Sequence, residues 1–547
     1  MALLIDLFGY LSVLVHGLVI AAQSVALGGA VFLLLLARPF AQAYAGGPEV
    51  MRRTARWAAW AAAALVGLEL LKLLMQGAVL TETLGVRPSS TLTADYAVAG
   101  MVKAGAAALL ALLLWRGRAG AAPVLALVLV VVGASTLTTH AAARMQDQPL
   151  LLAATALHIL GAAVWIGGIP YFLLALRRLH GGEAFRAVGA RFSRISMAGV
   201  ACIVASASVM SLWYIGDLQA VYGTNYGVMV SAKAAMFGAL LLLGLGNFLL
   251  VERLRANPGT PVLRMRRFAE VELGVGLTIF FAAASLTSVP PAVDLQQDRV
   301  TLTEIIERNT PRMPRLQSPD HDALALPSLQ AKLDAETAAG RAPAAAAFTP
   351  GAGELPIRNA ADIAWSEYNH HWAGLFVGLI GALGLLNRAG VGWAKHWPLA
   401  LLGMAGFLFV RSDPEVWPLG QIGFWESLRD VEVLQHRVFV LLIVAFALFE
   451  WGVRTGRLRQ PGAALVFPAV CALGGGLLLT HSHAIGNIRE ALLIELSHVP
   501  LALAGVGAGW SRWLELRADG AVRRWAGWAW PVCFIVVGVV LLSYREA

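Results

Sequence analysis

Most of the histidines in this chain fall in or beside apolar segments, where an imidazole is costly unless it is used. Histidine is the commonest side-chain metal ligand and suits copper, zinc and iron, and two histidines can also hold a haem. We therefore treat these histidines as candidate metal ligands. They are His16, His140, His158, His370, His371, His436, His481, His483 and His498.

Two other residues are candidates for supporting such a site. Glu495 precedes His498 by one helical turn, so its carboxylate is placed to orient that imidazole. Met145 follows His140 and offers a thioether, a soft ligand that suits copper. We expect Met145 to be at most an additional ligand beside the histidines.

The histidines recur with similar spacing in the two halves of the chain. Leu-Thr-Thr-His140 is followed by His158, and Leu-Leu-Thr-His481 is followed by His498. Each pair predicts a hairpin of two antiparallel helices, in which both imidazoles lie near the same end of the hairpin. Gly-Gly pairs also follow two of the histidines on their own predicted helices, and such small residues favour close helix contact. They are Gly28-Gly29 after His16 and Gly167-Gly168 after His158.

The composition is that of a membrane protein. Of 547 residues, 58% are hydrophobic and only 14% are charged, with a mean hydropathy of +0.68, whereas a soluble protein carries about 25% charged residues. This excludes a soluble enzyme, a disordered chain and a fibre. The net charge of +9 lies mostly in loops and does not indicate nucleic-acid binding. The three cysteines form no Cys-x-x-Cys and suggest no structural zinc.

A membrane-spanning helix needs about 20 mostly apolar residues. On that criterion we predict an all-α, polytopic membrane helix bundle of about fourteen spans, eight before the long polar stretch and six after it. The predicted spans are 7–37, 57–80, 94–115, 122–143, 150–176, 195–215, 228–251, 269–289, 366–386, 398–411, 433–452, 462–481, 491–513 and 526–544.

Arginine and lysine are concentrated in the loops that follow odd-numbered spans, which makes those loops cytoplasmic. Both termini and all nine histidines are then expected on the non-cytoplasmic side. We predict three parts: a membrane domain (1–290), a periplasmic linker with a short helix near Leu302–Ile306 (291–365), and a His-rich membrane domain (366–547).

Isolated charges occur inside the predicted spans as well. Glu69 and Lys72 are one helical turn apart and are expected to pair. Lys103 and Lys233 are expected to extend alone toward a helix end. The acidic loop 412–432 is expected to be solvated. No Walker A, Gly-x-Ser-x-Gly or His-Glu-x-x-His pattern occurs, so we do not expect an enzyme.

The first half of the chain, to about residue 295, resembles the copper resistance protein D family (CopD). The second half is similar to the extra membrane region of the longer proteobacterial members. The motifs in the first half are Leu-Thr-Thr-His140-Ala, His158 with Trp165-Ile-Gly-Gly168, and Thr287-Ser-Val-Pro-Pro291. Those in the second half are Tyr368-Asn-His-His-Trp372, Leu434-Gln-His-Arg437, Thr480-His-Ser-His483 and Glu495-Leu-Ser-His498.

The resemblance implies a bacterial inner-membrane protein of copper homeostasis or resistance that moves copper from the periplasm to the cytoplasm. It implies a periplasmic copper carrier as partner, besides membrane lipid and with no nucleic acid, and it carries over His16, His140 and His158 as copper ligands. Two alternatives stay open. One is a membrane cytochrome with haem b held by two outer histidines, His140 with His158 or His481 with His498. The other is a membrane scaffold or sensor for a periplasmic copper protein.

Overall fold

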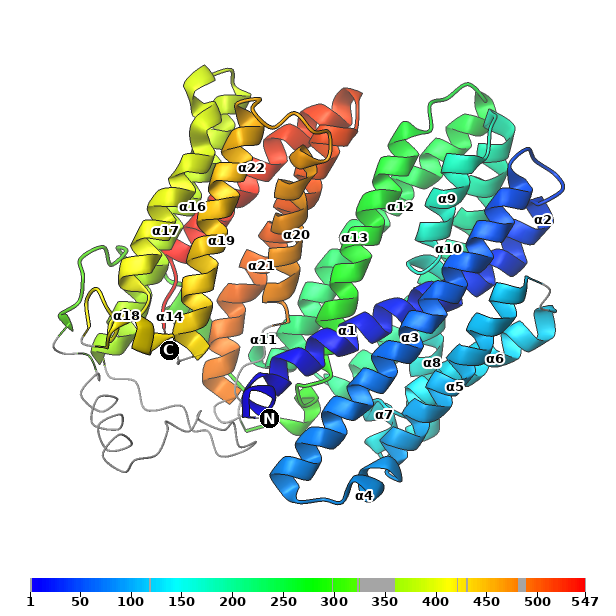
Figure 1. Cartoon of the computed structure of the whole chain (residues 1–547), viewed down its shortest axis with the longest axis horizontal. Coiled ribbons are helices and arrows are strands. Elements are labelled where there is room, and N and C mark those ends of the chain that lie inside the picture. The colour runs from blue at the N-terminus through cyan, green and yellow to red at the C-terminus, as the bar shows by residue number, and fades with distance from the viewer. Residues whose placement is uncertain are drawn as a thin grey trace. The chain divides into compact units, whose positions relative to one another are not determined.

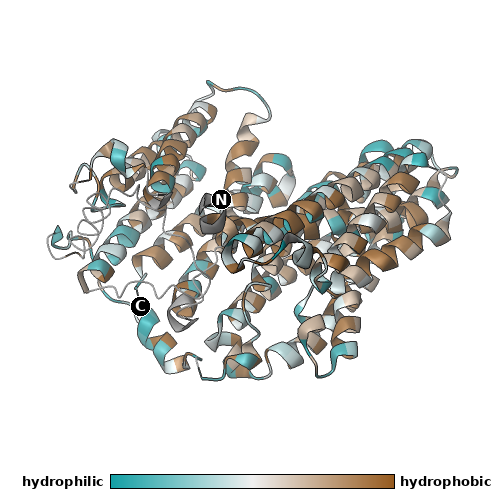
Figure 2. Ribbon diagram, turned by 60° about the horizontal axis from the view of Figure 1, so that its bottom comes forward, coloured by the Kyte–Doolittle hydropathy of each residue, from teal (hydrophilic) through white to brown (hydrophobic). Residues whose placement is uncertain are grey.

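The computed structural model describes residues 2–117, 120–297, 299–321, 324, 360–420, 422–428, 431–480 and 488–546. Over these residues the chain forms helices joined by loops, and no β-strand is present. Figure 2 shows apolar residues along the helices and hydrophilic residues gathered at many helix ends and loops. The predicted all-α membrane helix bundle is confirmed.

The helices separate into two compact units, each described here by itself. The first unit consists mainly of Leu7–Gln297, and the second mainly of Asp298–Leu479 together with His483–Ala547. The division of the sequence at residues 290 and 365 stays a prediction.

The first unit begins with α1 (Ala2–Phe32), which continues through a π-helical turn (Leu33–Ala37) into α2 (Arg38–Phe40). The remaining helices are α3 (Gly47–Leu84), α4 (Pro88–Leu92), α5 (Asp95–Arg116), α6 (Ala121–Thr136), α7 (His140–Ala143), α8 (Gln148–Trp165), α9 (Ile169–Arg178), α10 (Gly182–Tyr214), α11 (Leu218–Gly223), α12 (Asn225–Ala256) and α13 (Leu263–Leu286). In Figure 1, α3, α5 and α6 lie side by side, as do α12 and α13.

The second unit opens with α14 (Leu302–Asn309), the short helix expected in the linker. Thr301 and Glu304 close its first turn with a reciprocal capping box. The other helices are α16 (Ala360–Arg388), α17 (Ala400–Arg411) after a 3₁₀ segment (Gly392–Leu399), α18 (Phe424–Ser427), α19 (Val431–Arg454), α20 (Val466–Leu478), α21 (Ile488–Arg517) and α22 (Gly520–Leu542). Helix α22 packs against both α16 and α21.

Among the described residues, eleven helical segments are long and apolar enough to cross a membrane. Two further predicted spans correspond to the shorter apolar helices α6 and α20, and the predicted span 398–411 coincides with α17. The count of fourteen and the placement of the termini stay predictions.

The predicted span 150–176 consists of two helices, α8 and α9, separated at Gly167-Gly168. At this break the chain lies against α1. A Cβ atom on Gly28 would collide with the backbone of Ala163 and Gly167, and one on Gly167 would collide with the Ser24 carbonyl. Gly28 of one pair and Gly167 of the other therefore pack against each other, which is the close helix contact that small residues allow.

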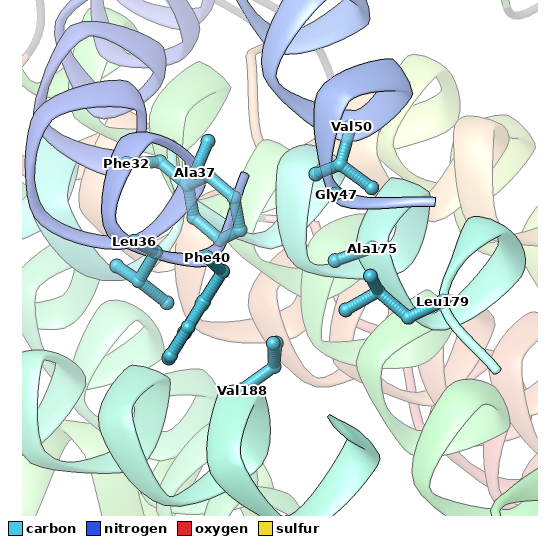
Figure 3. A pocket seen from close by; sticks show the side chains of 9 residues that line it. All are labelled: Phe32, Leu36, Ala37, Phe40, Gly47, Val50, Ala175, Leu179 and Val188. Carbon is cyan, nitrogen blue, oxygen red and sulfur yellow. The ribbon is translucent and has the colours of Figure 1, made fainter. Parts of the chain in front are cut away.

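A small pocket lies where α1, α2, α3, α9 and α10 meet (Figure 3). Its walls include Phe32, Phe40, Val50 and Val188, and every lining residue is apolar or glycine. Such a pocket offers no metal ligand, and the histidines lie elsewhere.

Candidate functional site

His158 has the clearest orientation among the histidines of the first unit. It lies on α8, and its Nδ1 is 3.0 Å from Oγ of Ser206 on α10. The Ser206 hydroxyl itself lies 3.0 Å from the Ile203 carbonyl, which can only accept. Because the hydroxyl has one proton, Nδ1 must donate to Ser206 and the lone pair is on Nε2. This is the neutral tautomer that ligates metals through Nε2.

A lysine accompanies His158. Lys233 on α12 is near enough to interact with it electrostatically. No ion-pair partner for this lysine is found in the part of the chain that the structure describes. The positive charge of Lys233 repels a cation at His158. A metal ion therefore binds there only if the free energy gained from its ligands exceeds this repulsion.

His140 begins the short helix α7, outside the candidate spans. Its ring is hydrogen-bonded to the backbone of Thr287, and its Nε2 is buried without a hydrogen-bond partner. Burial lowers the pKa of His140 below its ordinary value of 6.5. The ring is therefore neutral at pH 7, and a buried nitrogen lacking a partner is available for an additional ligand.

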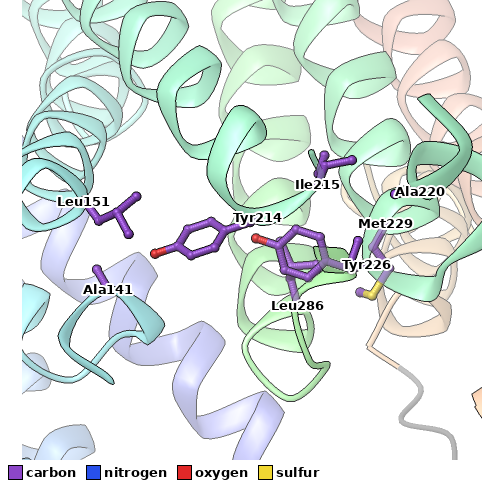
Figure 4. Packing of buried hydrophobic residues seen from close by; sticks show 9 residues of the cluster. Ala141, Leu151, Tyr214, Ile215, Ala220, Tyr226, Met229 and Leu286 are labelled. Carbon is purple, nitrogen blue, oxygen red and sulfur yellow. The ribbon is translucent and has the colours of Figure 1, made fainter. Parts of the chain in front are cut away.

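Next to His140 lies a buried apolar cluster that contains sulfur (Figure 4). Tyr214, Tyr226 and Met229 belong to it, and Met210 packs against it. Met145, by contrast, is fully exposed. In Figure 4, Met229 lies across the cluster from Ala141 of α7, with Tyr214 and Tyr226 between them. Met145, being exposed, is therefore not placed as a ligand beside His140, and the structure brings no methionine sulfur of this described cluster onto that ring.

His16 lies on α1 close to a buried charge cluster. The carboxylate of Glu69 on α3 is fully buried, and its two oxygens lie 2.9 Å from Lys72 Nζ and 2.7 Å from Lys103 Nζ. The spacing of Glu69 and Lys72 predicted the first pair. The expectation of a lone, extended Lys103 was wrong, because α5 packs against α3 and directs this lysine onto the same carboxylate.

In the second unit, two histidines present the same tautomer. Nδ1 of His370 on α16 lies 2.8 Å from the Ser366 carbonyl, and Nδ1 of His498 on α21 lies 2.8 Å from the Ile494 carbonyl. Since a carbonyl only accepts, both rings carry the proton on Nδ1 and the lone pair on Nε2. The Ile494 carbonyl thus orients the His498 ring, and the expected role of Glu495 toward this imidazole stays a prediction.

His370 and His498 both contact one aromatic ring. The His370 imidazole stacks on Tyr544 with ring centroids 3.8 Å apart, and the His498 ring lies edge-on at 6.5 Å. The Tyr544 hydroxyl donates to Glu546, 2.7 Å away, and this carboxylate is close enough to His370 to interact electrostatically. Two imidazoles, a phenol and a carboxylate are therefore gathered at one end of the bundle.

His371 has a different environment from its neighbour. It is buried, its Nδ1 accepts from the Arg315 N–H at 2.7 Å, and its Nε2 donates to the Tyr544 carbonyl at 3.0 Å. Both ring nitrogens are used, so this arrangement leaves no lone pair for a metal. His371 instead fastens the segment before α16 to the end of α22.

His436 on α19 forms a histidine–carboxylate pair. Its Nδ1 lies 2.6 Å from Oδ1 of Asp413, which is only 6% exposed. The expectation that loop 412–432 carries only solvated charge is wrong for Asp413, because α17 and α19 pack together and enclose its carboxylate. Such a carboxylate orients an imidazole and makes it a stronger ligand.

The histidines are not gathered into one centre. Across the described ranges, no group of three or more His, Cys, Asp and Glu side chains is arranged to hold a metal ion. His481 and His483 lie outside the described residues. Sequence analysis missed Ser206, Tyr544 and Glu546, since a lone hydroxyl or a carboxylate near a chain end has no motif that links it to a distant histidine.

Comparison with known proteins relates the first unit to copper proteins. The family model "Copper resistance protein D" matches residues 186–286, which run from α10 to α13 and include Ser206. The "Copper transport protein CutJ" of Bacillus subtilis (strain 168) is 26% identical over 178 residues, 32% of this chain. The chain covers 31% of that relative's length.

No solved structure matches the chain significantly. The family model matches the second part of the first unit and begins after His158, so it supports the resemblance of this half without covering the motifs around His140 and His158. Over residues 186–286 of its first unit, the chain is therefore similar to the copper resistance protein D family.

Proposed function

We propose that the protein binds copper through histidines of its first unit and carries the ion across the membrane from periplasm to cytoplasm. The hydrogen bond of His158 supports this most directly, because Ser206 places the ring proton on Nδ1 and leaves the lone pair of Nε2 for a ligand. Ser206 lies in the segment that matches the copper resistance family. His140, with its buried Nε2 that has no hydrogen-bond partner, is the second ligand that we assign.

The same proposal places the protein in the bacterial inner membrane, with its arginine-rich loops in the cytoplasm. Copper then reaches the histidines from the periplasmic side, delivered by a periplasmic copper carrier. The protein acts in copper homeostasis or resistance as a permease and performs no covalent chemistry.

Haem b is a second candidate, and one observation favours it. His370 and His498 have their lone pairs on Nε2, the nitrogen that ligates haem iron, and they lie on helices that both pack against α22. A haem protein would show a strong Soret band. A protein with neither metal nor haem would instead fit the scaffold or sensor alternative.

The test is metal analysis, an absorbance spectrum and copper uptake, all on the full chain purified in detergent and returned to liposomes. We expect nearly stoichiometric copper, no Soret band, and copper accumulation inside the vesicles. His158→Ala and His140→Ala should each lower uptake without lowering protein yield. His180→Ala, at an exposed position on the loop after α9, is the matched control and should transport normally.

Two results would contradict the proposal. Normal uptake in well-folded His158→Ala and His140→Ala variants would remove these residues from the copper path. A wild-type protein with no copper and a Soret band that shifts on reduction would make the protein a cytochrome.

A further inference from the structure

The ion cluster on α3 and α5 has an unusual composition for the interior of a membrane span. One carboxylate, Glu69, is shared by two ammonium groups, those of Lys72 and Lys103. Glu69 is 0% exposed and Lys103 is 2% exposed. Lys103 lies eight residues into α5, about 12 Å along the helix axis from Asp95. The cluster is therefore buried well inside both helices.

Packing alone does not account for this cluster. Moving charges out of water is expensive, and replacing a buried ion cluster with apolar residues is often neutral or stabilising. Intramembrane charges accordingly tend to mark ion pathways. Here three charges leave a net charge of +1, so the cluster is not a neutral pair that merely joins two helices.

An imidazole stands beside the ammonium groups. His16 on α1 is close enough to Lys72, Lys103 and Glu69 to interact electrostatically with all three. A carboxylate and an imidazole are both metal ligands. The two ammonium groups lie on the oxygens of Glu69 that a metal ion would use.

We propose that Glu69 is a copper-binding carboxylate inside the membrane, and that Lys72 and Lys103 are tethered cations which the copper ion must displace from it. This rests on the proposed function. When the ion leaves, an ammonium group returns to the carboxylate, so the site does not hold an uncompensated negative charge. The lysines thereby weaken copper binding and favour release.

The packing around Glu69 leaves it little freedom to move away from this site. A Cβ atom on Gly100 of α5 would lie 3.1 Å from Oε1 of Glu69 and 3.1 Å from the Leu73 side chain. The carboxylate therefore lies against bare backbone, and the exchange of cations must occur through movement of the long, flexible lysine side chains.

The first test is Lys103→Met, a change of similar length that removes the charge. Binding of Cu(II), the copper ion that nitrogen and oxygen ligands suit, to the full chain in detergent is measured by competition with a chromogenic chelator. We expect the variant to bind copper about tenfold more tightly or more, since a unit charge a few ångströms away opposes a buried cation strongly. Uptake by liposomes should become slower, because release is hindered. Lys72→Met removes the other ammonium and tests the same point if Lys103→Met folds poorly.

Lys395→Met is the matched control. It removes an exposed lysine on the 3₁₀ segment of the second unit, whereas the assigned copper ligands belong to the first unit. We expect its effect on copper affinity to be much smaller. An equal gain in both variants would assign the effect to long-range charge and overturn the competition at Glu69.

The double variant Glu69→Gln/Lys103→Met tests the carboxylate itself. It keeps the net charge of the cluster at +1, so any change does not come from total charge. The tighter binding of Lys103→Met should disappear, and uptake should fall at least about tenfold, as for loss of a metal ligand.

The outcomes separate this inference from the proposed function. If the wild-type protein neither binds nor transports copper, the proposed function fails. If the wild type transports copper while Lys103→Met and the double variant both behave like it, the function stands and the role of Glu69 is overturned.

Discussion

Gly28 on α1 and Gly167 at the end of α8 pack backbone against backbone. His16 and His158 lie on these two helices, each ahead of its glycine pair. The contact therefore fixes how the helices that carry two of the candidate ligands meet. A side chain at either glycine would force α1 and α8 apart.

Gly167→Leu should destabilise the first unit by about 1–3 kcal/mol, the usual cost of forcing extra methylenes into a close-packed contact. The measurement is the apparent melting temperature of the detergent-purified protein. Gly67→Ala on α3, where a Cβ meets nothing within 4 Å, is the control and should melt like wild type or slightly higher. Equal melting temperatures of Gly167→Leu and the wild type would show that α1 and α8 can move apart at no cost in stability.

Ser206→Ala should weaken copper binding about 10- to 100-fold, the range observed when a partner that orients a metal-binding histidine is lost. The His158 ring stays in place but its Nδ1 loses the hydrogen bond that fixes the tautomer. Ser208→Ala is the control, because its exposed hydroxyl bonds only the Val204 carbonyl. Chelator competition measures both variants, and equal affinities would show that Ser206 only fastens helices.

His371→Phe and His370→Ala should have different effects although the residues are adjacent. His371→Phe removes two buried hydrogen bonds and leaves the Arg315 N–H and the Tyr544 carbonyl without partners, which costs about 1–3 kcal/mol for each group. The melting temperature should fall clearly. His370→Ala should change it less and should affect any metal or haem in the second unit. The two variants are compared by melting and by metal and haem content, and a metal lost only from the His371 variant would reverse these roles.

Acidification should destabilise the metal-free protein in part through His140. Burial lowers the pKa of His140 below 6.5, the value expected in the unfolded chain. The unfolded state therefore binds a proton at a higher pH than the folded state does, so stability falls as the pH drops below about 6.5. The stability continues to fall until the pH is below the pKa of His140 in the folded protein. Apparent melting temperatures at pH 7.5 and 5.5 should differ less in His140→Gln than in wild type, and equal pH dependence would place the effect on other groups.

The sequence was sufficient for the class of fold and for several local contacts. Long apolar stretches must form helices in lipid, because every backbone group there needs an internal partner. The one-turn spacing of Glu69 and Lys72 predicted their pairing, and the two Gly-Gly pairs predicted close helix contact. These features depend on neighbours along one helix, which the sequence shows directly.

Only the tertiary structure decided the partners of each imidazole. His370 and His371 are adjacent in sequence, yet one presents Nε2 and the other uses both nitrogens. Lys103 reaches Glu69, and Asp413 reaches His436, from helices or loops distant in the chain. Hydrogen bonds and ion pairs of this kind depend on how helices turn and pack against one another. A histidine's type and spacing mark it as a candidate ligand, but its neighbours in space decide which nitrogen carries the proton.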